Sequence, residues 1–277
     1  MSLVVAMVGE GRLHACADLR VVKSENRPEG YEAHAPHYFN GVMKIVPISR
    51  SVAVAYAGAV SIALNIIREV YKLDLCSGEV AQKIQEMLTK SGDTSECDFL
   101  VIDAQDMEIH KIKDGSIETI RNGRTWIGDI NAYNLFQEKL EENGYNTAPN
   151  SIAKSSVMMN SLDAVIEDGS IESVGEFPIS IFNNKGEIQQ VVAFKAFGTN
   201  NSFKGDATDD SMIINLTVPI ESGIPALGFY LNKFKKGALY LPLIQDEPIL
   251  IDGNTIGEFR MKVMERFDIE LLGSGFE

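Results

Sequence analysis

Residues 2–18 read SLVVAMVGEGRLHACAD, two short apolar runs separated by a turn. Leu3 to Val8 is the first run, Gly9 to Arg12 is the turn, and Leu13 to Ala17 is the second run. Apolar runs of this length around a glycine-containing turn predict a β-hairpin. We therefore expect the chain to enter a sheet with its first residues.

Blocks of strands and pairs of helices alternate after this hairpin. The polar segment Lys23 to Tyr38 contains two prolines and a glycine and predicts a loop. Further strands are predicted at Val42–Val46, Val52–Tyr56, Asp98–Asp103, Glu108–Ile112, Ser116–Ile120, Trp126–Gly128, Pro178–Phe182 and Ile188–Phe194. Helices are predicted from Gly58 to Val70, from an N-cap at Ser77 to Lys90, at Ala132–Glu142 and at Pro149–Ile166.

This order predicts the α+β class, with two antiparallel sheets between helix layers. The continuous apolar runs Val52–Tyr56 and Phe99–Ile102 predict strands that are covered on both faces. The pattern changes near Thr199. We expect residues 1–195 to form one domain and residues 196–277 to form a β-rich C-terminal extension. Its strands are predicted at Met212–Ile220, Ala226–Leu231, Ala238–Leu243 and Pro248–Ile251, followed by a helix at Thr255–Phe267.

Composition excludes several classes of function. The formal net charge is −14, and an acidic surface repels phosphate backbones, so neither nucleic acid nor an anionic membrane is an expected partner. Cys16, Cys76 and Cys97 are an odd number without CxxC spacing, which favours a reducing cytoplasm over a disulfide framework. The longest weakly polar run, Ser51 to Leu64, is too short to span a bilayer. The N-terminus has no basic region typical of a signal peptide.

Five short segments carry a resemblance to a known family. Ser2 precedes the first strand, and Ala17-Asp18 ends the second. Gly41-Val42-Met43-Lys44-Ile45 begins a later strand, and Ala55-Tyr56-Ala57-Gly58-Ala59 links a strand to a helix. Trp126-Ile127-Gly128-Asp129 precedes another helix. In order and spacing over residues 2 to 195, these segments resemble proteasome β subunits, which are N-terminal-nucleophile (Ntn) hydrolases.

The resemblance implies a four-layer αββα Ntn sandwich and a set of catalytic roles. Ser2 would be the nucleophile, with its own α-amine as the base once Met1 is removed. Lys44 would lower the pKa of the hydroxyl, Asp18 would orient Lys44, and the Gly58 N–H would stabilise the oxyanion. Asp129 stands where the family commonly has a serine and would favour a charged amine. The implied substrate is a peptide or small amide. A homo-oligomer is expected, without cofactor or metal.

Two alternatives remain open at this point. The chain could be a catalytically silent proteasome-like protein that serves in binding or assembly, as proteasome α-type subunits do. It could also bind a small cationic molecule in an acidic pocket around Asp18 and Asp129. A free Ser2 amine favours catalysis, whereas retained cationic ligand in the purified protein favours the pocket.

Other chemistry-bearing residues give weaker patterns. His34 and His37 share a polar loop but have no third ligand nearby in sequence. His14 and His110 fall in strands and are expected to be structural. Asp206, Asp209 and Asp210 lack the spacing and the terminal glutamate of a calcium loop. Cys16 shares a strand face with Asp18 but is expected to be a small core residue.

Overall fold

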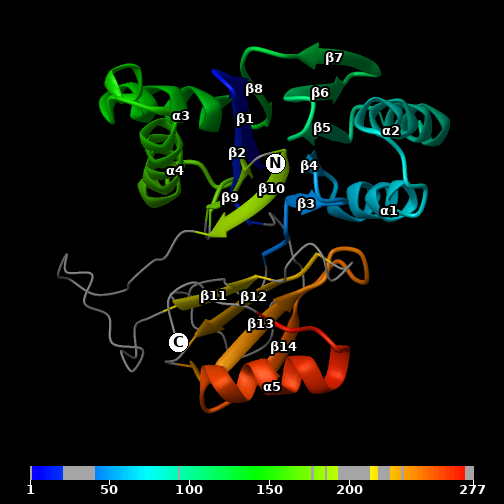
Figure 1. Ribbon diagram of the computed structural model, residues 1–277, viewed down its shortest axis with the longest axis vertical. Coiled ribbons are helices and arrows are strands. Elements are labelled where there is room, and N and C mark those ends of the chain that lie inside the picture. Colours follow the sequence, from blue (N-terminus) through cyan, green and yellow to red (C-terminus); the bar gives the residue numbers. More distant parts are fainter. Residues whose placement is uncertain are drawn as a thin grey trace.

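The computed structural model describes residues 2–20, 41–92, 94–175, 178–184, 186–192, 213–217, 225–231 and 234–271. Over these residues the chain is α+β, with five α-helices and three antiparallel sheets (Figure 1). The α+β class predicted from the sequence is confirmed. The predicted loop from Lys23 to Tyr38 and the predicted domain boundary after residue 195 both lie outside the described residues.

The first sheet contains the N-terminal hairpin. Its strand order is β10 (Glu187–Val192), β9 (Ile179–Asn184), β2 (Arg12–Ala17), β1 (Leu3–Gly9) and β8 (Gly123–Gly128). Successive side chains of a strand point to opposite faces. Leu3 and Val5 of β1 therefore pack with Cys16 against α3 (Ile130–Glu142) and α4 (Ser151–Asp168), which cover this face (Figure 1).

The second sheet has the order β3 (Ile45–Pro47), β4 (Val52–Gly58), β5 (Cys97–Asp103), β6 (Glu108–Lys113) and β7 (Ser116–Ile120). Its outer face packs against α1 (Val60–Tyr71) and α2 (Ser77–Ser91). The expected N-cap of α2 was one residue off. Cys76 is the N-cap and Ser77 is the first helical residue, because the Glu79 carboxylate reaches back to accept a hydrogen bond from the Cys76 N–H at 3.1 Å.

The inner faces of these two sheets share one core. Val4 and Ala6 of β1 lie in the same cluster as Leu100 and Ile102 of β5. All residues of β4 before Gly58 are buried. The prediction that the continuous apolar strands are covered on both faces is therefore confirmed, and it follows from having the other sheet on one side and helices on the other.

The C-terminal part forms the third sheet and one helix, close to the predicted ranges. The sheet order is β11 (Ile213–Thr217), β12 (Leu227–Leu231), β13 (Lys236–Tyr240) and β14 (Ile249–Asp252). The helix α5 (Ile256–Phe267) begins after Thr255, whose side chain accepts a hydrogen bond from the Glu258 N–H.

The two faces of this third sheet have different partners. Tyr230 and Leu239 face α5 and pack with Phe259. On the other face, Leu227, Phe229, Ala238 and Tyr240 join the core between the first two sheets. The third sheet therefore closes one end of that core, as its position below the other two sheets in Figure 1 also indicates.

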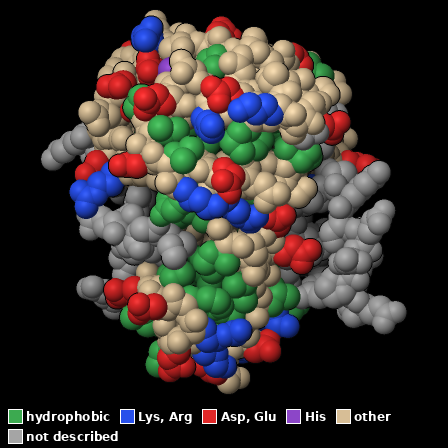
Figure 2. Space-filling model, turned by 90° about the vertical axis from the view of Figure 1, so that its right-hand side faces the viewer, with side chains coloured by type: hydrophobic (Ala, Val, Ile, Leu, Met, Phe, Trp, Pro, Cys, Tyr) green, Lys and Arg blue, Asp and Glu red, His purple; other side chains and the backbone are tan. Residues whose placement is uncertain are grey.

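Charged side chains of both signs are interspersed over the face that includes α1, α2 and α5 (Figure 2). Hydrophobic side chains gather in the lower half of this view. Within the described ranges, no helix combines the length and apolar character needed to cross a membrane.

A 3₁₀ helix, η1 (Tyr145–Thr147), joins α3 to α4.

Candidate functional site

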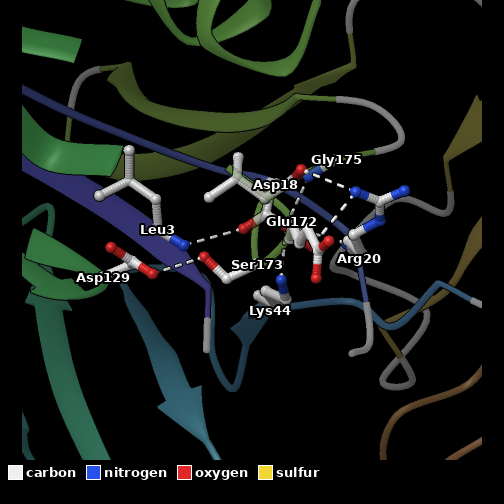
Figure 3. A network of polar contacts seen from close by, with 9 residues as sticks. Leu3, Asp18, Arg20, Lys44, Asp129, Glu172, Ser173 and Gly175 are labelled. Atoms are coloured by element: carbon white, nitrogen blue, oxygen red, sulfur yellow. Dashed lines mark hydrogen bonds and ion pairs between the residues drawn. The ribbon is translucent and has the colours of Figure 1, made fainter. Parts of the chain in front are cut away.

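Three of the predicted site residues, Asp18, Lys44 and Asp129, lie close together near the end of the β1–β2 hairpin that carries the N-terminus (Figure 3). The hairpin register pairs Val4 with Ala17, so the residues just before β1 and just after β2 are neighbours. The Leu3 N–H donates to Asp18 Oδ1 at 2.9 Å, and the Asp18 N–H donates to the Leu3 carbonyl at 3.3 Å. Asp18 thus fixes the backbone immediately after Ser2.

Asp18 also forms a buried ion pair with Lys44. Lys44 Nζ lies 2.7 Å from Asp18 Oδ2, and the two side chains are 1% and 0% exposed. Lys44 immediately precedes β3, and its carbonyl accepts a hydrogen bond from the Tyr56 N–H of β4 at 3.1 Å. The pair therefore joins the first sheet to the second at this end of the core.

Two further backbone donors complete the surroundings of the Asp18 carboxylate. The N–H groups of Arg20 and Gly175 donate to Oδ2 at 3.0 and 3.3 Å. Gly175 belongs to the segment between α4 and β9, and its N–H reaches Asp18 over 157 residues of sequence. Protein donors thus occupy both carboxylate oxygens, which argues against a cation-binding pocket at Asp18.

Gly58 lies at the end of β4, two residues beyond Tyr56. The Ala59 N–H donates to the Glu96 carbonyl at 3.0 Å, which makes residues 59 and 96 a hydrogen-bonded pair. Hydrogen-bonded and non-hydrogen-bonded pairs alternate along an antiparallel ladder. The next pair, Gly58 with Cys97, therefore has no hydrogen bonds between the two strands. The Gly58 N–H accordingly points away from β5, toward the side of β4 on which Lys44 lies.

Gly128 and Asp129 hold the other side of Ser2. The Asp129 N–H donates to the Ser2 carbonyl at 2.7 Å. Gly128 has a φ of +104°, and a Cβ on it would lie 1.9 Å from the Ser2 carbonyl oxygen and 3.3 Å from the Ala57 Cβ. Only glycine fits where β8 approaches both Ser2 and β4 this closely.

The Asp129 side chain caps α3. Its Oδ1 accepts hydrogen bonds from the Asn131 and Ala132 N–H groups at 2.8 and 3.3 Å, and Oδ2 accepts one from the Ser173 hydroxyl at 2.7 Å. Burial acts to raise the pKa of Asp129, but the hydrogen bonds from Ser173, Ala132 and Asn131 outweigh it and hold this pKa below its ordinary value of 3.8. The carboxylate is therefore charged at neutral pH, and protein donors occupy both of its oxygens.

The substitution Asp129→Asn should remove a pH-dependent part of the stability. Because the folded-state pKa of Asp129 lies below the unfolded value, its contribution is complete above about pH 4 and is lost as pH falls through the folded pKa. Urea unfolding of both proteins should therefore give a difference that is constant from pH 7 to pH 5 and smaller at about pH 3. A difference that stays constant over the whole range would contradict this account.

Three site residues were not predicted from the sequence: Arg20, Ser173 and Gly175. Ser173 and Gly175 come from the turn after α4. Arg20 Nη1 holds this turn in place by donating to the carbonyls of Glu172 and Val174 at 3.2 and 3.3 Å (Figure 3). The sequence feature that could have indicated this turn is the short segment between α4 and β9, which contains serines and glycines.

Cys16 and His110 pack inside the fold, and several other candidates lie outside the described residues. Burial raises the pKa of Cys16 to about 12, so this thiol is a protonated core group, as expected. His110 Nδ1 lies 3.0 Å from the Thr119 hydroxyl, in keeping with the structural role expected of it. His34, His37, Asp206, Asp209 and Asp210 lie outside the described residues. Across the described ranges, no group of three or more His, Cys, Asp and Glu side chains could hold a metal ion.

The assembled site is enclosed. Ser2, Asp18, Lys44 and Asp129 are 5%, 0%, 1% and 7% exposed. No family model matches the chain, and no curated protein matches its sequence.

Proposed function

We propose that the chain is an Ntn-type amidohydrolase that cleaves a peptide or small amide bond with Ser2 as its nucleophile. The observation that carries this proposal is the buried Asp18–Lys44 pair bound to the backbone next to Ser2. A buried ion pair is weak evidence for stability, because desolvation offsets much of its attraction. Ionisable groups that are buried beside a potential nucleophile are typical of active sites.

The proposal includes the four-layer αββα Ntn arrangement of the first 190 or so residues. It is supported by the shared core of the two sheets and by the two pairs of helices on their outer faces. The site would lie at the end of this core where Lys44 and Gly58 of the second sheet approach Ser2 and Asp18 of the first.

In the proposed reaction, Ser2 Oγ attacks the amide carbonyl and its proton passes to the Ser2 α-amine. The ammonium of Lys44, oriented by Asp18, favours the developing alkoxide. The Gly58 N–H stabilises the oxyanion of the tetrahedral intermediate. Collapse breaks the C–N bond, the α-amine gives its proton to the leaving amine, and water then hydrolyses the acyl ester on Ser2. The base exists only if Met1 has been removed.

A fluorophosphonate, which phosphonylates activated serine hydroxyls with release of fluoride, tests this proposal directly. Protein expressed without added N-terminal residues should begin at Ser2 by N-terminal sequencing. Peptide mapping should then find the adduct on Ser2 and not in Ser2→Ala. Lys44→Met should lower the labelling rate by about a hundredfold or more. The control Ser51→Ala, in the turn before β4, should label at the wild-type rate.

Retention of Met1, or no adduct on a free Ser2, would refute catalysis and leave the silent binding or assembly role. The enclosure of Ser2, which is 5% exposed, favours that second candidate. Under it, Ser2→Ala should leave oligomeric state and partner binding unchanged, whereas substitutions on the exposed face of α5 should alter them. Analytical ultracentrifugation of both kinds of variant separates the two functions.

A further inference from the structure

A pocket of about 230 Å³ lies at the opposite end of the β1–β2 hairpin from Ser2. With about 3.4 Å per strand residue, the two ends of β1 are roughly 20 Å apart, so this pocket is separate from the candidate catalytic site. Its polar lining comes from the hairpin, from β8 and the residue before it, and from the N-terminal part of α4. These residues are Glu10, Arg12, His14, Asn122, Arg124, Lys154 and Ser155.

Strand register places the key side chains on one face of the first sheet. Met7 of β1 pairs with His14 on one side and with Arg124 on the other, so the three point the same way. This is the face on which Leu3, Val5 and Cys16 pack under α3 and α4. The helices cover the apolar part, and the face becomes cationic where α4 begins.

The lining of this pocket has a positive net charge, whereas the whole chain has a negative one. Arg12, Arg124 and Lys154 contribute three cations, and Glu10 is the single acidic residue of the lining. Glu10 pairs with Lys154 at 3.0 Å, and the charges of the described lining residues sum to +2. The protein as a whole carries −14. A local cationic cluster on an acidic protein focuses small anions at this position.

The aromatic ring of Tyr145 positions two of these cations. The guanidinium of Arg124 lies 5.4 Å from the ring centroid, and the ammonium of Lys154 lies 5.6 Å from it. Cation–π contacts at this distance hold both groups beside the pocket. Lys154 also belongs to the first turn of the 18-residue helix α4, whose N-terminal end carries partial positive charge.

The buried imidazole of His14 supplies an independent sign of a ligand. His14 is 3% exposed, and its Nδ1 has no hydrogen-bond partner among the described residues. A buried polar atom without a partner is costly. Burial lowers the pKa of His14 to about 4, so the ring is neutral at pH 7 and can carry its proton on Nδ1. An anion in the pocket would accept that N–H.

We propose that this pocket is a binding site for a small phosphate-bearing molecule, held by Arg12, Arg124 and Lys154 with His14 as a neutral donor. The net charge of +2 in the lining matches a phosphate dianion, and arginine forks bind its oxygens in pairs. A volume of about 230 Å³ is below the usual range for drug-sized ligands, so the pocket accommodates the phosphate group and a small attached fragment.

Titration of the whole chain with inorganic phosphate at constant ionic strength tests the site. Calorimetry should show saturable binding that sodium chloride does not reproduce. Arg124→Gln and Lys154→Gln should each weaken it about tenfold. Arg50→Gln removes the same charge from an exposed side chain in the turn between β3 and β4, and it should leave affinity within about twofold.

A second readout follows His14 itself. In ¹⁵N spectra of the histidine rings, phosphate should shift the signal that is missing in His14→Gln. The proposal would be overturned if Arg124→Gln and Lys154→Gln bound phosphate as tightly as the wild-type protein. Tighter binding of succinate than of phosphate would overturn the assignment of a phosphate group, and no saturable binding of phosphate would overturn the site.

Discussion

Replacing Asp18 with asparagine is expected to destabilise the protein by about 3–5 kcal/mol, measured as the loss in free energy of unfolding in urea. The substitution keeps the shape of the side chain but removes its charge. Lys44, which is 1% exposed, then loses its carboxylate partner inside the core. One carboxylate oxygen also becomes an NH₂ group that faces protein donors, since both oxygens accept hydrogen bonds from N–H groups.

A double-mutant cycle separates the ion pair from simple loss of packing. Adding Lys44→Met to Asp18→Asn removes the cation that has lost the Asp18 carboxylate, so the double variant should be more stable than the sum of the single effects predicts. Glu69→Gln makes the same chemical change in the exposed Glu69–Lys72 pair of α1 and should cost less than about 1 kcal/mol. Equal losses for Asp18→Asn and Glu69→Gln would show that the buried pair has no special role.

Gly128→Ala should cost about 3 kcal/mol or more and should displace the N-terminus. The new Cβ would lie 1.9 Å from the Ser2 carbonyl oxygen, which is backbone and has no alternative rotamer. The φ of +104° adds strain for any side chain. Relief requires β1 to move away from β8, which breaks the bond from the Asp129 N–H to the Ser2 carbonyl.

Gly123→Ala, at the other end of β8, is the matched control. Gly123 has a similar φ of +118°, but a Cβ there meets no atom within 4 Å. It should therefore show the backbone strain alone, about 1–3 kcal/mol. The difference between the two variants measures the clash with Ser2. If both lose the same stability, the close approach of β8 to Ser2 contributes nothing.

Periodicity and turn residues were sufficient to predict most of the secondary structure. The hairpin at Leu3–Ala17 and the final helix after Thr255 have the predicted type and nearly the predicted bounds. The resemblance to proteasome β subunits also selected Ser2, Asp18, Lys44, Gly58 and Asp129, which lie at or beside strand ends of the first two sheets. These residues flank strands, and the pairing of those strands determines which ends meet.

The parts of the fold and site that the sequence did not predict depend on contacts between distant segments. Ser173 reaches Asp129 from a turn whose position is fixed by Arg20, and no local pattern encodes that contact. The sequence predicted a strand at Ala226–Leu231 but not which surface covers Leu227 and Phe229. The cationic pocket likewise appears only when the register sets Arg124 and His14 on either side of Met7.

The shared core of the three sheets has a consequence for how the protein unfolds. Leu227, Phe229, Ala238 and Tyr240 fill space that the first two sheets would otherwise leave open to water. Loss of the C-terminal part would expose both sides of that contact, so neither part reaches its full stability without the other. Calorimetry should accordingly record a single cooperative transition, and fragments expressed separately should aggregate or need each other to fold.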